Sequence, residues 1–234
     1  MTDTLAARSL GALVAESPAR AGVFDRLGLD YCCHGDRSLA EATEAAGLDP
    51  DAVVAALAAV GRPATTAPAA PAGDPLALIE DILSRHHGFL RDELPDLVGL
   101  AAKVEAVHGS RHPELAAVHR LVAALRADLE PHMTKEERVL FPAVRLLAGG
   151  RRQFGFGTIE NPIAMMRSEH EQAGELLARL REVTGGYAVP ADGCASYESL
   201  YRRLEHVEED THLHIHKENN VLFPLAVALQ AGRP

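Results

Sequence analysis

Aromatic residues and cysteines are scarce in this sequence. Its 234 residues include no Trp, four Tyr, six Phe and three Cys. A chain rich in Ala, Leu, Glu and Arg favours helices over sheets, so we predict an all-α fold. The cysteines Cys32, Cys33 and Cys194 are too few and odd in number for a disulfide framework, so we expect reduced thiols in the cytoplasm.

Excess positive charge and long apolar runs are also absent. The formal net charge is −10, and since phosphate binding needs a basic surface, we expect no nucleic-acid partner. No stretch approaches the roughly 18 apolar residues of a membrane span, so none is expected. The N-terminus has no basic start followed by an apolar segment, which argues against a signal peptide.

A proline-rich stretch divides the chain. Residues 61–75, GRPATTAPAAPAGDP, contain four prolines, which break helices and favour an extended linker. We predict a small helical N-terminal domain over residues 1–60, a linker over 61–74 and a larger domain over 75–234. Capping and turn residues mark the short N-terminal helices: Ser17-Pro18, Gly28, the pair Ser38 and Glu41, and Asp49-Pro50.

Long helical patterns fill the larger domain. They cover about 75–108, 113–148, 160–184 and 194–230, and in the first of them apolar residues recur every three or four positions. Glycine pairs end the second and third, while Pro142 and Pro224 are expected to kink the second and fourth. Four such helices with modest connections predict an up-and-down four-helix bundle.

One phrase occurs twice in this domain. HMTKEERVLFP starts at His132 and HIHKENNVLFP starts at His214, and the two match at seven of eleven positions. Each copy places a His four residues before a Glu, namely Glu136 in the first copy and Glu218 in the second. Residues four apart lie on the same side of a helix. One His and one carboxylate from each copy can therefore reach a common centre.

The other two helices supply histidines at matched positions. His87 and His170 are 83 residues apart, against 82 for His132 and His214. The bundle then has two similar halves, and four imidazoles with two bridging carboxylates suit two metal ions. Imidazole and carboxylate favour iron, although zinc and manganese fit the same ligand types. Two His per ion leave coordination positions open for an oxo bridge or a small molecule.

A duplicated metal-free bundle is the plainer interpretation. It explains the repeated Val-Leu-Phe-Pro as packing residues, but not why His and Glu are retained in register. His86 and His87 flank the apolar stripe about equally, so the helical pattern leaves that choice open. Four histidines have no counterpart in the other half, namely His108, His112, His119 and His206. They are expected to be mostly solvated, and two or three of them are expected to support the ligands by hydrogen bonds.

Several segments resemble the iron–sulfur cluster repair di-iron proteins, also called repair-of-iron-centres proteins. The resemblance covers nearly the whole chain and implies a hemerythrin-like bundle preceded by a small domain with vicinal cysteines. The segments that carry it are LDYCCHGDRSLAEA at 29–42, HHGFLRDELPDL at 86–97, KVEAVHG at 103–109, SEHEQAGELL at 168–177, and both copies of the repeated phrase.

The resemblance also implies a ligand set. The family histidine that precedes the LRDELPDL segment corresponds to His87, which resolves the choice against His86. His108 lies in a family motif and is expected to support the ligands. The implied ligands of two non-haem, oxo-bridged iron ions are His87, His132, Glu136, His170, His214 and Glu218.

The implied activity is repair of iron–sulfur clusters damaged by nitrosative or oxidative stress. Two mechanisms are compatible with open coordination positions: donation of iron to a damaged cluster, and nitric oxide reductase-like turnover at the di-iron centre. The partners would be damaged iron–sulfur proteins and an electron donor, and a homodimer through the small domain is compatible. The alternative is a hemerythrin-like module that senses or binds oxygen, iron or nitric oxide without repair activity.

The vicinal pair Cys32-Cys33 is expected to handle iron or exchange thiols during repair. The pair lies in a polar loop beside His34, and adjacent thiols do not easily form an unstrained disulfide with each other. The plainer interpretation is a pair of small buried side chains at a helix end. Cys194 has no neighbouring cysteine or histidine in the sequence and is interpreted as incidental.

Overall fold

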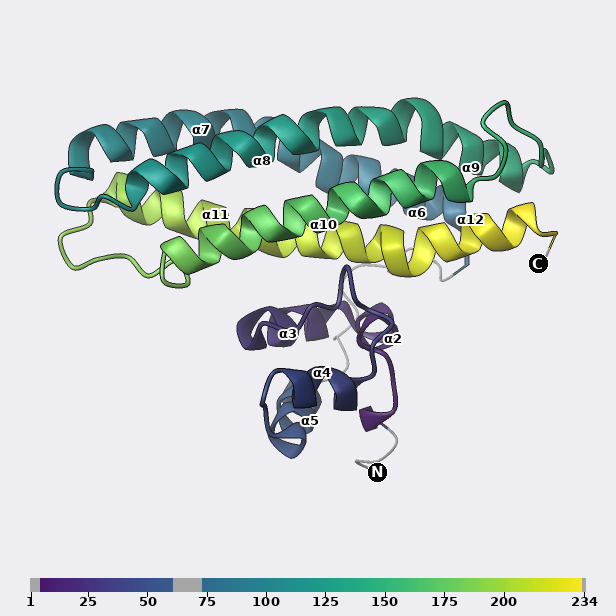
Figure 1. Ribbon diagram of the computed structural model, residues 1–234, viewed down its shortest axis with the longest axis horizontal. Helices are drawn as coiled ribbons and strands as arrows, with labels where there is room; N and C mark the ends of the chain where they lie inside the picture. The colour runs from purple at the N-terminus through teal and green to yellow at the C-terminus, as the bar shows by residue number, and fades with distance from the viewer. Residues whose placement is uncertain (1–4, 61–72, 233–234) are drawn as a thin grey trace. The chain divides into compact units, whose positions relative to one another are not determined.

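The computed structural model describes residues 5–60 and 73–232, and these residues form helices and loops without a strand (Figure 1). The predicted linker falls mainly on residues 61–72, which lie outside the described residues. The chain divides into two compact units. One comprises residues 81–144 and 153–211, and the other residues 1–80, 145–152 and 212–234.

The first of these units contains a four-helix bundle. Its helices are α7 (Gly88–His108), α8 (Leu115–Lys135), α10 (Glu160–Val183) and most of α11 (Ala195–Lys217), and Figure 1 shows them running alongside one another. All four contribute to one buried apolar core, with Leu97, Leu125, Leu177 and Leu204 as members. The predicted all-α fold and up-and-down bundle are confirmed.

The predicted helix ranges agree with the structure to within about two residues. The first range is continuous from α6 (Pro75–Asp81) through α7, and the second ends with α9 (Phe141–Ala148). The fourth ends with α12 (Phe223–Gln230). In the described chain, no helix is both long enough and apolar enough to cross a membrane.

Three π-helical turns interrupt these long helices. They are η2 (Ile82–His87), η3 (Glu136–Leu140) and η4 (Glu218–Leu222). In η3 and η4 the N–H of the following Phe bonds to the carbonyl oxygen five residues earlier. Pro142 and Pro224, which have no N–H to donate, come directly after these turns. Widened turns of this kind are common at functional sites.

The other unit includes the N-terminal helices α2 (Leu10–Glu16), α3 (Ala21–Leu27), α4 (Leu39–Ala45) and α5 (Pro50–Ala59). The predicted capping box of Ser38 and Glu41 forms, and Gly28 ends α3 at φ 66°. Ser17 does not cap a helix through its side chain, because a short 3₁₀ turn, η1 (Pro18–Arg20), begins there instead. The core of this unit includes Ile215, from the last turns of α11.

Candidate metal centre

One carboxylate of the bundle unit, Glu136, is surrounded by three imidazoles. Its Oε2 lies 3.3 Å from Nε2 of His87 and 3.4 Å from Nε2 of His132. Its Oε1 lies 4.0 Å from Nε2 of His170. All four side chains are buried, and Glu136 is 0% exposed. Two of these residues lie in π turns, His87 at the end of η2 and Glu136 at the start of η3.

The second copy of the repeated phrase repeats this geometry. Nε2 of His214, near the end of α11, lies 3.2 Å from Oε1 of Glu218, the first residue of η4. Both side chains are 0% exposed. The spacing of four residues therefore brings His and Glu together in this copy as it does for His132 and Glu136.

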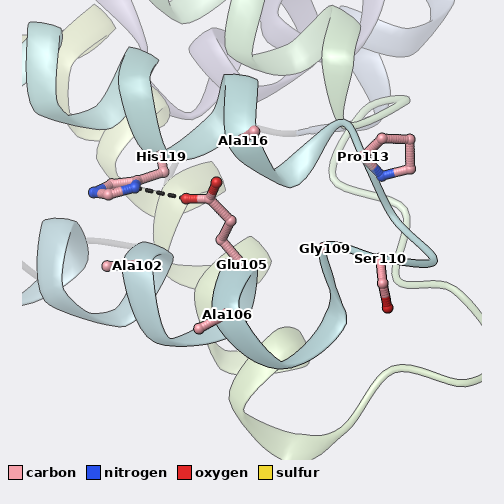
Figure 2. Close-up of a pocket in the computed structure, with 8 residues that line it drawn as sticks. All are labelled: Ala102, Glu105, Ala106, Gly109, Ser110, Pro113, Ala116 and His119. Atoms are coloured by element: carbon pink, nitrogen blue, oxygen red, sulfur yellow. Dashed lines mark hydrogen bonds and ion pairs between the residues drawn. The ribbon is translucent and has the colours of Figure 1, made fainter.

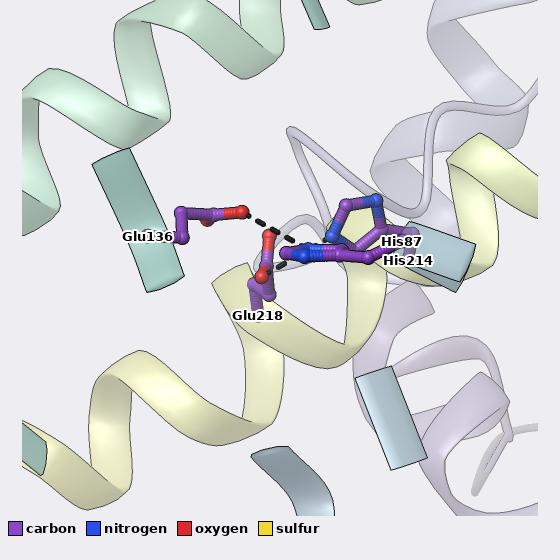
Figure 3. A group of neighbouring side chains, drawn as sticks. All are labelled: His87, Glu136, His214 and Glu218. Carbon is purple, nitrogen blue, oxygen red and sulfur yellow. Dashed lines mark ion pairs between the residues drawn. The ribbon is translucent and has the colours of Figure 1, made fainter. Parts of the chain in front are cut away.

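The six predicted ligands form two groups that share both carboxylates. His87 and His214 form one group with Glu136 and Glu218, and Figure 3 shows their polar atoms converging. His132 and His170 form the other group with the same two carboxylates. Within each group the candidate ligand atoms lie within 4.8 Å of one another. Two imidazoles per group and two shared carboxylates is the arrangement expected for two ions with bridging carboxylates.

A carboxylate outside the predicted set orients His87. Nδ1 of His87 lies 2.7 Å from Oε1 of Glu137, which also accepts a hydrogen bond from Arg91 at 2.7 Å. Burial raises the pKa of Glu137, but the hydrogen bonds from Arg91 and His87 outweigh it and lower that pKa. An ionised carboxylate can only accept, so Nδ1 of His87 donates its proton to Glu137, and Nε2 is the nitrogen available to a cation.

Glu169 plays the same part for His132. Its Oε2 lies 2.9 Å from Nδ1 of His132, and its other oxygen accepts from Lys135. Burial raises the pKa of Glu169, but the hydrogen bonds from Lys135 and His132 have the larger effect, and the pKa is lowered overall. Nε2 of His132, which lies beside Glu136, is therefore also the nitrogen available to a cation. Sequence reasoning missed Glu137 and Glu169 because it searched for ligands within one helix, and these contacts join different helices.

The donor set fits a pair of divalent cations. Two carboxylates at 0% exposure need positive charge nearby, because burying an uncompensated carboxylate is strongly unfavourable. Nε2 of His132 lies 3.1 Å from Nε2 of His170, so two ring nitrogens converge on one point beside Glu136. Imidazole and carboxylate ligands suit iron, manganese or zinc, and disfavour copper(I), which prefers thiolate and thioether.

The remaining histidines have other neighbours. His86 pairs with Asp210 at 2.8 Å, so the structure places His87 and not His86 in the ligand groups. His206 packs edge-on against Phe89. Four further histidines lie near carboxylates or polar side chains: His112 with Asp192 and Glu114, His119 with Glu105, His212 with Asp25, and His216 with Asn220.

His108 lies beside a cysteine. Its Nε2 is 3.2 Å from Sγ of Cys194, and its Nδ1 is 3.5 Å from Nη2 of Arg111. Both ring nitrogens thus face groups other than the six ligands. Its expected support of the ligands is replaced by this pairing, and Cys194, interpreted as incidental from the sequence, gains a buried histidine as its neighbour.

Cys32 and Cys33 form a third group of candidate ligands with Asp30. The two sulfurs are 3.8 Å apart, and Sγ of Cys32 is 3.3 Å from Oδ1 of Asp30. Oδ1 also accepts from the backbone N–H of Cys33 at 2.8 Å, and Oδ2 pairs with His34 at 2.6 Å. The hydrogen bond with Cys33, followed by burial, raises the pKa of Cys32, so this sulfur is a neutral thiol at pH 7 when no cation is bound.

The loop with these cysteines is hydrogen-bonded to the π turn that begins with Glu218. Asn220 donates to the carbonyl oxygens of Tyr31 at 3.3 Å and Cys32 at 3.1 Å. Asn219 donates to the Cys32 carbonyl oxygen at 3.2 Å. The backbone beside the thiols and the turn that presents one ligand carboxylate are therefore held together by side-chain amides.

A groove at the start of α8 has a different character. It is lined by small side chains and by His119, which pairs with Glu105 (Figure 2). None of the six predicted ligands lines it.

Comparison with known proteins matches both parts of the chain to described domains. Residues 78–226 match the hemerythrin HHE cation binding domain, and residues 6–61 match a domain of unknown function, DUF542. The iron–sulfur cluster repair protein YtfE of Cronobacter sakazakii is 34% identical over 221 residues, which cover 94% of this chain and 96% of that protein. The proteins of the same name from Escherichia coli O1:K1 and Citrobacter koseri are also 34% identical, with the same coverage. The chain therefore belongs to the iron–sulfur cluster repair protein family, and its bundle is a hemerythrin-type cation-binding domain.

Proposed function

We propose that this protein repairs iron–sulfur clusters damaged by nitrosative or oxidative stress, with two iron ions held by the six buried ligands. The observation that carries the proposal is the pair of ligand groups that share Glu136 and Glu218. Relatives of almost the same length are named for iron–sulfur cluster repair. Its partners would then be damaged iron–sulfur proteins of the cytoplasm.

When bound, iron would supply redox chemistry and open positions for a small molecule. The chain's own residues hold the ligand geometry: Glu137 and Glu169 fix two imidazoles through Nδ1. A hollow of about 110 Å³, lined by His132, Glu169 and Lys135 among others, lies beside this support. Lys135 there donates to Glu169 and favours its ionised form, so that Glu169 can accept from Nδ1 of His132.

The thiol group favours iron donation over nitric oxide reduction as the mechanism. Asp30, Cys32 and Cys33 place an oxygen and two sulfurs within 4.8 Å of one another, a set that can accept an iron ion. Asn219 and Asn220 hold their loop to the turn of Glu218. A sensing module without repair activity would have no use for this arrangement.

Metal analysis tests the centre. We expect two iron ions per chain in protein purified without oxygen, and the double variant Glu136→Ala with Glu218→Ala should bind neither. Glu208→Ala is the matched control, because Glu208 is another buried glutamate of the bundle but pairs with Arg181. One zinc ion and no iron in the natural protein would refute the di-iron proposal.

Repair assays test the thiols separately. Cys32→Ser with Cys33→Ser should keep both iron ions and lose restoration of a damaged cluster in a client protein. Cys194→Ser is the matched control and should restore clusters normally. If the double variant repairs clusters as well as the natural protein, iron handling by these thiols is refuted, and nitric oxide consumption by the loaded protein becomes the better-supported mechanism.

A further inference from the structure

Cys194 occupies the position directly before α11, where the first N–H groups of the helix have no partner within the helix. Nε2 of His108, the last residue of α7, lies 3.2 Å from its sulfur. Cys194 is an exposed residue, whereas His108 is buried.

The contacts of His108 determine which nitrogen carries its proton. Nδ1 faces the guanidinium of Arg111 at 3.5 Å, and a guanidinium can only donate. Nδ1 is therefore the acceptor, and Nε2 carries the hydrogen that points at the sulfur. This N–H donor, at the start of a helix where backbone N–H groups have no partner within the helix, stabilises a thiolate over a thiol.

The other charged groups near this sulfur largely compensate one another. Asp192, two residues earlier, is the nearest carboxylate of the connecting loop. It pairs with Arg111 at 3.1 Å and with Nε2 of His112 at 2.9 Å. The ring of Tyr197 packs edge-on against those of His108 and His112. The negative charge of Asp192 is thus balanced by its partners rather than directed at the thiolate.

We propose that Cys194, paired with His108, is a nucleophilic thiol that exchanges with small-molecule disulfides. The site lies outside the ligand groups and the Cys32-Cys33 loop, so the proposal is independent of metal binding and cluster repair. Because Cys194 is an exposed residue, a small disulfide can approach it without moving the bundle.

The exchange is balanced without a further reagent. The thiol proton leaves to water, and the Cys194 thiolate attacks one sulfur of the disulfide. The new sulfur–sulfur bond forms as that of the reagent breaks, and the other half departs as a thiolate that takes a proton from water. Cys194 is oxidised to a mixed disulfide, and the departing half is reduced to a thiol.

The expected rate follows from the acidity of the sulfur. The N–H of Tyr197, followed by His108, lowers the pKa of Cys194 to about 7 from an ordinary value of 9.0. At pH 7 the thiolate fraction rises from about 1% to about 50%, while the lower basicity reduces nucleophilicity by about eightfold. The net gain is about sixfold, and attack is fastest for a thiol whose pKa is near the ambient pH.

The full-length protein with oxidised glutathione as the probe tests the proposal. Mass spectrometry of digests, after timed reaction between about pH 5 and 10, gives the rate of mixed-disulfide formation at each cysteine separately. For Cys194 we expect a rate that rises with a midpoint near pH 7. His108→Leu should move the midpoint upwards and slow the reaction at pH 7 by at least twofold. His119→Leu is the matched control and should change neither.

Either of two outcomes would overturn the proposal. The first is a midpoint for Cys194 near the ordinary value of a thiol, or glutathione found only on Cys32 and Cys33. The second is a folded His108→Leu variant whose Cys194 reacts as in the natural protein. If that variant does not fold, as judged by circular dichroism, the pH profile of the natural chain decides alone.

Discussion

Removal of Glu169 should weaken the binding of one metal ion and leave the other almost unchanged. Its carboxylate accepts from Nδ1 of His132 at 2.9 Å, while Glu137 does the same for His87 at 2.7 Å. His132 and His87 belong to different ligand groups. Each supporting carboxylate therefore acts mainly on one ion.

The magnitude follows from what such a partner does for an imidazole. It fixes the tautomer and ring orientation and raises the basicity of the nitrogen that binds metal, and its loss typically lowers affinity by about 10- to 100-fold. That range corresponds to about 1.4–2.8 kcal/mol of binding free energy. We expect Glu169→Ala to weaken the ion at His132 and His170 by this factor. Glu137→Ala should weaken the ion at His87 and His214 similarly.

Competitive titration with a chelator measures both sites. Each variant should show one tight and one weakened ion, and the double variant Glu137→Ala with Glu169→Ala should show both ions weakened. Glu130→Ala provides the control, because Glu130 pairs with Arg126 on the outer face of α8 and should have no effect. If both ions weaken equally in Glu169→Ala, or neither weakens, the assignment of one supporting carboxylate to each ion is refuted.

Three further predictions concern stability. Asn220→Ala removes two hydrogen bonds to the thiol loop and should lower its local stability by about 1–3 kcal/mol, seen as faster hydrogen exchange at residues 31–35, with Arg138→Ala as the control. Gly35→Ala places a Cβ against Oδ1 of Asn220 and 2.5 Å from the backbone oxygen of Tyr31, and should lower the unfolding free energy by about 1–3 kcal/mol in thermal unfolding. Gly22→Ala, with its nearest neighbour at 3.6 Å, should not. Glu208→Ala leaves Arg181 without its ion-pair partner. Because the side chain of Arg181 is 32% exposed, we expect the unfolding free energy to fall by about 1–3 kcal/mol rather than by the roughly 3–5 kcal/mol of a fully buried pair. The metal content should be unchanged. Unchanged hydrogen exchange in Asn220→Ala would contradict the first expectation, and an unchanged thermal unfolding midpoint in Gly35→Ala would contradict the second. An unchanged denaturant midpoint in Glu208→Ala would contradict the third.

The sequence predicted the long helices and the two His–Glu pairs of the repeated phrase because both depend on local periodicity, whereas the choice of His87 over His86 came from the family resemblance. Apolar residues at every third or fourth position select a helix face, and the four-residue interval of His132 and Glu136 places both on one side of it. The Ser38 and Glu41 capping box is equally local. These features are fixed by residues within one or two turns of each other, so no knowledge of packing was needed.

The missing parts depend on contacts between helices. Glu169 lies 37 residues from His132, and Cys194 lies 86 residues from His108. Periodicity within one helix cannot give the axial register that brings such residues together. Ser17 was assigned as a cap from its residue type, but the cap depends on the backbone that follows, which is a 3₁₀ turn here. Sequence patterns therefore identified candidate ligands better than the residues that support them.

The two copies of the repeated phrase differ where their supporting roles differ. Glu136 and Glu218 are each followed by two residues that vary, Glu137-Arg138 in the first copy and Asn219-Asn220 in the second. In the first copy Glu137 orients a ligand histidine. In the second copy both amides hold the backbone of the cysteine loop. A carboxylate could not donate to those carbonyl oxygens, so the change from Glu to Asn is the one that a loop anchor requires. Both copies of the turn keep the ligand Glu and the Phe-Pro pair that follows. The turn therefore supports a ligand histidine in one half and the thiol loop in the other.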